Sequence, residues 1–340
     1  MKFTAPVEGL YLFGVTATTS ELQLQSSSGP LASMHSDTGT SSTLATVLLR
    51  EGETVQAIPG TAAGLSFLGT GLHSTSGLAS VHVVSGTSSQ PLSVENIRQP
   101  IIMQSHAKQG EQLSYEAATG CVQVHTGGTY MVSLTLSSDG PAYASLTIGS
   151  QVLGLGDDGQ GQGMISNSAI VTLEPGDCVL PRLEPLSKIH GHDRWSQLVV
   201  ATLPGDDDEA FSYGLSLPFW NPGLAPEPVG FDVPIHPNNN FHQGVFSIQE
   251  EDYNPRRFYL VLVHAFLASG SLTVELGDDV AWKSVAGGQA DTTDRRMVSI
   301  TTIVEMDNIW HRMRVTATGL LDEGDNRFAT FSAARIGKLV

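Results

Sequence analysis

Two histidines at alternate positions have the residue types and spacing that suit metal binding. His190 and His192 flank Gly191, and Asp193 follows them. In an extended loop, the imidazoles at positions i and i+2 point to the same side. Copies of this pair that met on a threefold axis would surround a divalent cation with nitrogen ligands. A solvated polar loop is the simpler interpretation, and it requires no metal.

Acidic clusters in three places supply carboxylates of the kind that bind Ca²⁺. Two of them, Asp157-Asp158-Gly159 and Asp278-Asp279, lack the spacing of a known calcium loop, so turn chemistry is the favoured explanation. The third, Asp206 to Glu209, follows Pro204-Gly205, and this combination predicts a turn and a solvated linker.

Catalytic motifs are missing from the sequence. No Gly-x-Ser-x-Gly elbow lies between a predicted strand and a helix, and no phosphate-binding glycine loop precedes a helix. The aromatic residues Phe219, Trp220, Trp282 and Trp310 would suit a ligand groove, but packing in a core or between subunits is favoured. The sequence therefore predicts a protein that is not an enzyme and that has no catalytic residues and no cofactor.

Charge and composition restrict the classes of protein to which the chain could belong. A net charge of −17 argues against a nucleic-acid partner, because phosphate would be repelled. Only 15% of the residues are charged and 36 are glycine, which favours short strands joined by turns over long helices. No apolar run approaches the ~20 residues of a membrane span. Neither a signal peptide nor an Asn-x-Ser/Thr sequon is recognisable.

The two cysteines, Cys121 and Cys178, lie in different predicted strands. Two cysteines do not make a disulfide framework, so we expect two unpaired, buried thiols.

The elements that would position these residues occur in repeated pairs. Val122 to Ser133 alternates, breaks at Gly127-Gly128 and resumes with β-formers, which predicts strand, turn and strand. Ile170 to Val179 is a strand interrupted by a Pro-Gly-Asp turn. The same signals recur at Phe3–Phe13 with Val47–Val55 and at Phe258–Val263 with Ile303–Ile309, and each pair is followed by a further strand: Leu65–Leu72, Ser196–Ala201 and Phe328–Ala333.

Three copies of one all-β unit explain this pattern. We expect the units at residues 1–75, 76–205 and 206–340. The first unit lacks the strands that precede the tyrosine strand in the other two, so its sheets would have unpaired edges. Either a partner donates the missing strands by β-augmentation, or the chain was cut from a longer parent.

Further strand patterns complete the later units, and many short strands with turns are typical of a sandwich or jelly roll. The polar stretch Gly154 to Gly163 and the insertion Leu186 to Arg194 are predicted loops. The predicted strands are Ala79–Val84, Pro100–Met103 and Gln112–Tyr115 in the second unit, and Ala210–Ser216, Pro228–Asp232, Asn240–Ile248, Ser271–Leu276 and Met297–Thr302 in the third.

These motifs resemble the C1q domain of the C1q/TNF jelly-roll superfamily, over nearly the whole chain. Phe3, Pro6, Gly9, Tyr11 and Phe13 follow a family signature. Gly52-Glu53-x-Val55 and Gly176-Asp177-x-Val179 resemble a family strand, and the third unit follows the family's order with Ala210-Phe211-Ser212-x-Gly214-Leu215, Pro228-Val229-x-Phe231-Asp232, Asn240-Phe241 and Gly244-Val245-Phe246. The chain departs from the family at Met306, at Pro255-Arg256-Arg257 and in having no collagen-like stalk.

The resemblance implies tandem antiparallel jelly-roll β-sandwiches that trimerise through apolar faces and bind ligands without catalysis. We expect a homotrimer of three stacked layers, with one chain folded as an internal pseudo-trimer as the alternative. A virion component, such as a fibre or capsid decoration that recognises a glycan or protein receptor, is the first expectation for function. A secreted extracellular lectin-like or matrix protein is the alternative, and a hydrolase on a jelly-roll scaffold is a third class. The location is accordingly the virion or the extracellular space.

Overall fold

In a computed structural model, the described part of the chain is almost entirely β-strand. The structure describes residues 1–19, 21–35, 40–59, 62–72, 79–84, 92–94, 99–103, 105–139, 142–158, 162–189, 196–203, 209–216, 219–220, 225–248, 256–278, 280–290, 296–307, 310–322 and 329–338. Within these ranges no helix has the length and apolar character needed to cross a membrane. Every strand pair is antiparallel, so the predicted all-β fold of antiparallel jelly-roll sandwiches is confirmed.

The strands pair within three stretches of chain, here named the first segment (residues 1–72), the second segment (79–203) and the third segment (209–338). In the first segment, one sheet has the order β1-β6-β3-β4 and the other β5-β2-β7. Its strands are β1 (Lys2–Thr4), β2 (Gly9–Thr19), β3 (Glu21–Ser26), β4 (Gly29–His35), β5 (Ser41–Leu49), β6 (Thr54–Pro59) and β7 (Ala62–Gly71).

The second segment is a larger sandwich. One sheet runs β11-β8-β20-β14-β17, with β19 and β9 beyond β14, and the other runs β12-β13-β18-β15-β16, with β10 on β18. Its strands are β8 (Ser80–Val84), β9 (Leu92–Val94), β10 (Gln99–Pro100), β11 (Ser105–Gln109), β12 (Leu113–Glu116), β13 (Cys121–Val124), β14 (Gly128–Asp139), β15 (Ala142–Ile148), β16 (Gln151–Asp158), β17 (Gln162–Leu173), β18 (Cys178–Leu183), β19 (Ser187–Ile189) and β20 (Gln197–Thr202).

In the third segment the long strand β27 serves both layers. Its first half pairs with β29 and β31, and its second half pairs with β28 and β30. The strands are β21 (Ala210–Gly214), β22 (Phe219–Trp220), β23 (Glu227–Pro228), β24 (Val233–His236), β25 (Phe241–His242), β26 (Val245–Ser247), β27 (Arg257–Gly277), β28 (Trp282–Ala290), β29 (Arg296–Met306), β30 (Arg312–Asp322) and β31 (Thr330–Lys338).

Several sequence predictions are wrong in detail. Ile101 to Met103 is not a strand, because only Gln99 and Pro100 pair with β18. The predicted loop from Gly154 is instead largely strand, because β16 continues to Asp158 against β15 and β17 begins at Gln162 against β14. The two strands around Gly127 lie in opposite sheets of the sandwich, so the glycine turn is a crossover between layers. The turn glycine Gly176 has the expected positive φ, 99°.

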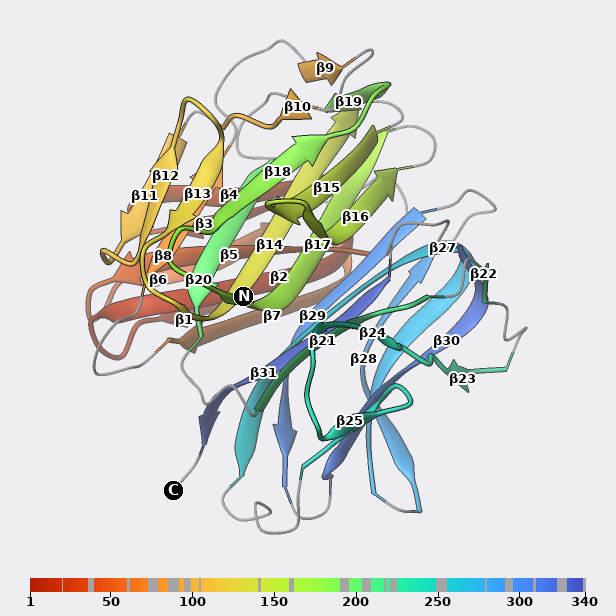
Figure 1. Ribbon diagram of the computed structural model, residues 1–340. Coiled ribbons are helices and arrows are strands. Elements are labelled where there is room, and N and C mark those ends of the chain that lie inside the picture. Colours follow the sequence, from red (N-terminus) through yellow and green to blue (C-terminus); the bar gives the residue numbers. More distant parts are fainter. Residues whose placement is uncertain are drawn as a thin grey trace.

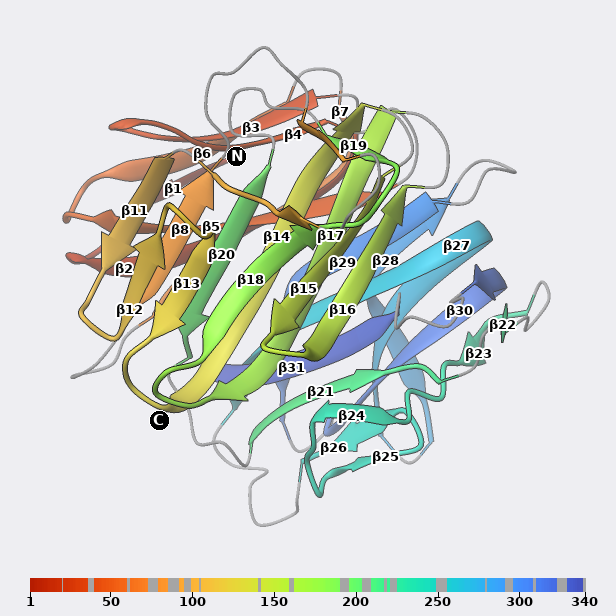
Figure 2. The same ribbon diagram turned by 45° about the horizontal axis from the view of Figure 1, so that its top comes forward.

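The three segments surround a common centre, as the red, yellow-green and blue groups of strands show in Figures 1 and 2. Each segment has its own apolar core, and a fourth buried cluster takes residues from all three. This arrangement differs from the expected homotrimer of stacked layers. The apolar faces that were expected to meet between three chains are buried within one chain, as in the pseudo-trimer alternative.

Candidate functional site

The shared cluster, here called the axial cluster, is built from equivalent positions of the three segments. Tyr11, Tyr130 and Tyr259 point into their own cores, so the next residue on each strand points to the opposite face. That residue is Leu12, Met131 or Leu260, and none of the three has exposed surface. The axial cluster comprises Leu10, Leu12, Leu44, Leu72, Met131, Ile170, Val199, Ala201, Leu203, Ala210, Leu260, Leu262, Ala334 and Ile336.

Buried hydrogen bonds join the first segment to both of its neighbours. Thr16 Oγ1 donates to the carbonyl oxygen of Thr301 at 3.2 Å and accepts from the Thr301 amide at 3.1 Å. The Gln197 side-chain amide donates to Thr43 Oγ1, and its oxygen lies 2.9 Å from the Nε2 of His82.

A third contact completes the ring. Thr330 Oγ1 donates to the carbonyl oxygen of Ser168 at 3.3 Å, which joins the third segment to the second. Each segment therefore uses one edge strand, β5, β17 or β29, against the sheet face of the next segment. This cyclic order is the geometry of a trimer built within one polypeptide.

His264 is a fully buried histidine on β27, at the position equivalent to Thr16 on β2 and Thr135 on β14. Its Nδ1 lies 3.0 Å from Ser299 Oγ. Burial lowers the pKa of His264 to about 3, from an ordinary value of 6.5. The imidazole is therefore neutral in the folded chain at any pH near neutrality.

This burial predicts a specific acid sensitivity. Between pH 6.5 and 3 the unfolded chain binds a proton that the folded chain excludes at His264, so stability falls as the pH is lowered. The expected contribution is up to about 1.4 kcal/mol per pH unit in the free energy of unfolding. Urea unfolding of the wild type and of His264→Gln at several pH values should show a shallower decline for the variant. His242→Gln, at an exposed position, is the control, and an unchanged pH dependence in His264→Gln would contradict the assignment.

Glu209 forms a buried ion cluster, which corrects the prediction that the acidic run is a solvated linker throughout. Its carboxylate pairs with both Arg257 and Arg335. The side chain of Arg257 is only 7% exposed, and burial is the main cause that lowers its pKa. Asp206 to Asp208 lie outside the described residues. No sequence signal links Glu209 to arginines so far along the chain, because only the fold brings them together.

Cys121 and Cys178 form a disulfide, so the prediction of two unpaired thiols is wrong. They lie on the neighbouring strands β13 and β18, and their Cα atoms are 5.6 Å apart. Both cysteines were placed in predicted strands, but only the tertiary structure shows that these two strands pair. The bond links residues 57 positions apart.

Removal of this bond is expected to destabilise the second segment. A disulfide that closes a loop of this length stabilises a fold by about 4 kcal/mol in the chain-entropy model. Urea unfolding of Cys121→Ser/Cys178→Ser should therefore show a lower midpoint than the oxidised wild type. Reductant should lower the wild-type midpoint and leave the double variant unchanged. Two titratable thiols in the denatured, unreduced wild type would contradict the bond.

The predicted metal ligands His190 and His192 lie outside the described residues, as does Asp279. Among the residues that are described, no group of three or more His, Cys, Asp or Glu side chains is arranged to hold a metal. Asp278 instead accepts backbone hydrogen bonds from Val280 and Ala281, at 2.7 and 2.6 Å. These bonds, led by that from Ala281, lower the pKa of Asp278, as expected for a turn residue.

The side chains of the other acidic pair, Asp157 and Asp158, are not described, although their backbones pair with β15.

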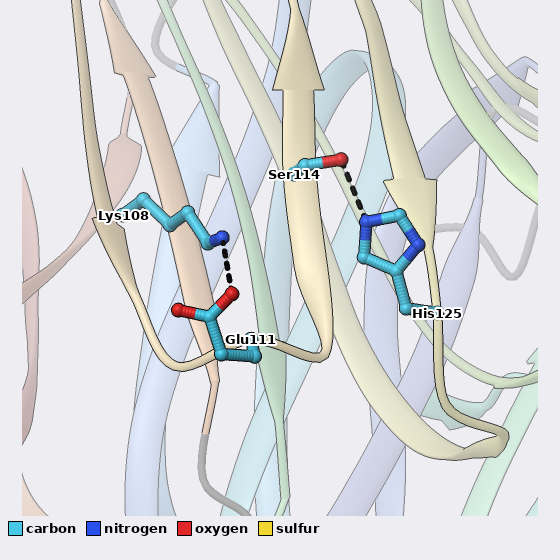
Figure 3. Close-up of polar contacts among 4 residues, drawn as sticks. All are labelled: Lys108, Glu111, Ser114 and His125. Carbon is cyan, nitrogen blue, oxygen red and sulfur yellow. Dashed lines mark hydrogen bonds and ion pairs between the residues drawn. The ribbon is translucent and has the colours of Figure 1, made fainter.

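One serine–histidine pair lies on the surface of the second segment (Figure 3). Ser114 Oγ lies 2.8 Å from His125 Nε2, between β12 and the end of β13. A nucleophile and base also need an acid that orients the histidine. In Figure 3 the nearby carboxylate of Glu111 pairs with Lys108 at 3.3 Å instead. Among the described residues the pair therefore lacks the arrangement of a catalytic triad, and it is a cross-strand surface contact.

The tryptophans do not gather into a groove in the described structure. Trp282 stacks under the guanidinium of Arg314, whose central carbon is 3.9 Å from the ring centre. Trp310 packs against the core of the third segment. The side chains of Phe219 and Trp220 are not described. The favoured prediction of packing therefore holds for Trp310, and Trp282 adds a cation–π contact.

Comparison with known proteins identifies no family for the chain. No protein-family model matches the sequence, and no curated protein matches it. Among solved structures, the Eiger TNF of S. frugiperda matches with 16% identity and a TM-score of 0.31, over 37% of this chain and 93% of that one. Murine APRIL at pH 8.0 matches with 13% identity and a TM-score of 0.31, over 37% of this chain and 100% of that one. At these TM-scores the likeness adds no argument about function, and the fold assignment rests on the strand pairing itself.

Proposed function

We propose that this chain is a non-enzymatic structural and recognition protein that folds as a trimer within one polypeptide. The three modules are the jelly-roll units 1–75, 76–205 and 206–340. The observation that carries the proposal is the axial cluster, to which every segment contributes buried apolar side chains. Such a shared core holds the three modules as one rigid body. The loops of the three modules can differ in sequence, whereas the three subunits of a homotrimer carry identical loops.

Native mass spectrometry tests the oligomeric state. One chain has a mass of 36.0 kDa, and we expect this mass for the purified protein. A complex of three chains would contradict the single-chain trimer and favour the stacked homotrimer. A metal at His190 and His192 is retained as a proposal, and it predicts a divalent ion that EDTA removes. One chain carries this histidine pair only once, so removal of the metal ion by EDTA should not change the number of chains in the particle.

The proposed setting is a virion surface, where the chain would serve as a fibre or capsid decoration that contacts a receptor or glycan. The Cys121–Cys178 disulfide supports an oxidising location, such as a virion surface or the extracellular space. The alternative, a secreted lectin-like or matrix protein, is compatible with the same bond. A glycan array and a cell-binding assay with the folded chain would identify the recognised ligand class. Chain recovered in purified particles would favour the virion role, whereas soluble chain in the medium would favour the secreted one.

A further inference from the structure

The edge of β7 is the most exceptional feature of the three-segment arrangement. In the second segment, β20 is covered by β8 and then β11, and in the third segment β31 is covered by β21 and then β24. Their counterpart in the first segment, β7, is the last strand of a three-stranded sheet. Within the described residues, no strand occupies the position next to it.

Side chains on β7 are exposed where their counterparts are buried. Phe67 pairs with Val15 of β2, as Phe331 pairs with Val263 of β27. Phe331 is completely buried and makes an edge contact with Phe211 of the covering strand β21, with ring centres 4.9 Å apart. Phe67, which has no such cover, is only partly buried.

The neighbouring segment shows the same difference. Ile170 on β17 and Ile303 on β29 hold equivalent places opposite Met131 and Leu260. Ile170 is fully buried, and its strand lies against β21 of the third segment. Ile303 faces the first segment and is only partly buried. The uncovered position is therefore bounded by apolar surface on two sides, from β7 and from β29.

The composition of β7 is that of a paired strand. Exposed edge strands usually carry lysine or proline, which discourage pairing with another chain. The outer strands of the other two segments follow this rule, with Lys108 in β11 and Pro234 in β24. In contrast, the ten residues of β7 include neither a charged residue nor a proline.

Backbone donors on β7 point outward at alternate residues. The amide of Leu72 donates to Leu10 of β2, so by alternation the amides of Gly71, Gly69 and Phe67 point away from β2. In the second segment the counterpart of Gly71 is Thr202, whose amide donates to the carbonyl of Ala79 beside β8 at 2.9 Å. The outward amides of β7 therefore match a ladder that the second segment already uses.

We propose that the edge of β7 binds an extended strand of a partner polypeptide by β-augmentation. The occupant has the alternation of β21, which fills this place in the third segment. By that register, a large apolar side chain like that of Phe211 would lie opposite Gly69, and a small polar one like that of Ser212 opposite Leu68. The apolar side chain would pack toward Phe3, which is partly buried and lies near Gly69. The added strand would also bury Phe67 and Ile303.

Hydrogen–deuterium exchange of the full chain tests this proposal with a synthetic probe. The probe is the peptide Ala-Phe-Ser-Tyr-Gly-Leu-Ser, which has the sequence of residues 210–216. We expect it to slow exchange at the amides of Phe67, Gly69 and Gly71. In the third segment the amide of Leu215 donates to the carbonyl of Ala329, so by alternation Tyr213 also carries a donor toward β31. The same peptide with proline in place of its tyrosine should therefore give no protection, because it lacks this ladder donor. Protection absent at millimolar peptide, or present only elsewhere, would overturn the assignment.

Two variants separate specific docking from general stickiness. Phe67→Ala should weaken the peptide about tenfold or more, which is about 1.4 kcal/mol of binding free energy. Tyr143→Ala, at an exposed aromatic on the outer sheet of the second segment, should leave binding unchanged. If both variants weaken binding equally, the β7 site is wrong.

A fused probe keeps the test decisive if the free peptide binds too weakly. Joined to Met1 through a flexible linker, the same seven residues should raise the unfolding temperature, and a proline-containing fusion should not. Equal unfolding temperatures for the two fusions would overturn the proposal. Native mass spectrometry without peptide tests whether a second copy of this chain occupies the edge of β7 instead. A dimer of the wild type that is lost in Phe67→Ala would identify a second copy, rather than a partner polypeptide, as the occupant. The β7 proposal depends on the structural equivalence of the three segments and not on the proposed function. A monomeric chain that fails to bind the probe would therefore contradict the β7 site but not the single-chain trimer.

Discussion

Leu260→Ala should lower the free energy of unfolding of the whole chain by about 3 kcal/mol, within the ~2–5 kcal/mol typical of a buried leucine. Leu260 has no exposed surface, and its side chain lies in the axial cluster between the three segments. The substitution removes buried methyl groups and leaves a cavity that rigid neighbouring strands cannot fill. Urea unfolding monitored by tryptophan fluorescence would measure the loss.

The spread of the destabilisation by Leu260→Ala over the three segments tests whether the axial cluster couples them. Because Leu12 and Met131 share the cluster, Leu260→Ala should also speed amide exchange on β2 and β14. A matched control is Val280→Ala, at a side chain that is 91% exposed, which should change stability by less than about 0.5 kcal/mol. Faster exchange confined to the third segment would show that the axial cluster does not couple the segments.

Glu209→Gln should cost about 3–5 kcal/mol, the range for removing one partner from a buried ion cluster. The variant keeps the shape of the side chain but removes the negative charge that pairs with Arg257 and Arg335. Both arginines are mostly shielded from water, with 7% and 15% side-chain exposure, so solvent can compensate little. Thermal and urea unfolding would report the loss.

A surface pair provides the control for the Glu209 prediction. Glu305 pairs with Arg256 at 3.0 Å, and both side chains are well exposed, at 40% and 61%. Glu305→Gln should therefore change the free energy of unfolding by less than about 1 kcal/mol. Similar small effects for both substitutions would mean that Glu209 is hydrated in solution. If Glu209→Gln strongly lowers the free energy of unfolding and Glu305→Gln does not, Glu209 stabilises the start of the third segment against β27 and β31, which carry Arg257 and Arg335.

Local patterns were enough to predict most of the strands. Alternation of apolar and polar residues predicted β13, the second half of β27 and β29, because one face of each strand packs on a core. Turn chemistry predicted the bend at Gly176, since few other residues adopt its φ of 99°. These features depend on residues close together in the sequence.

Features that join distant residues were decided by the tertiary structure. An apolar second face, such as that of Leu12 or Leu260, must be buried, but packing within one chain and packing between three chains satisfy this need equally. Only the arrangement of the segments shows that the faces meet inside one polypeptide. For the same reason Glu209 resembled linker charge until the fold brought Arg257 and Arg335 to it. Sequence alone determined most of the strands, whereas the axis, the ion cluster and the disulfide required contacts that no local pattern encodes.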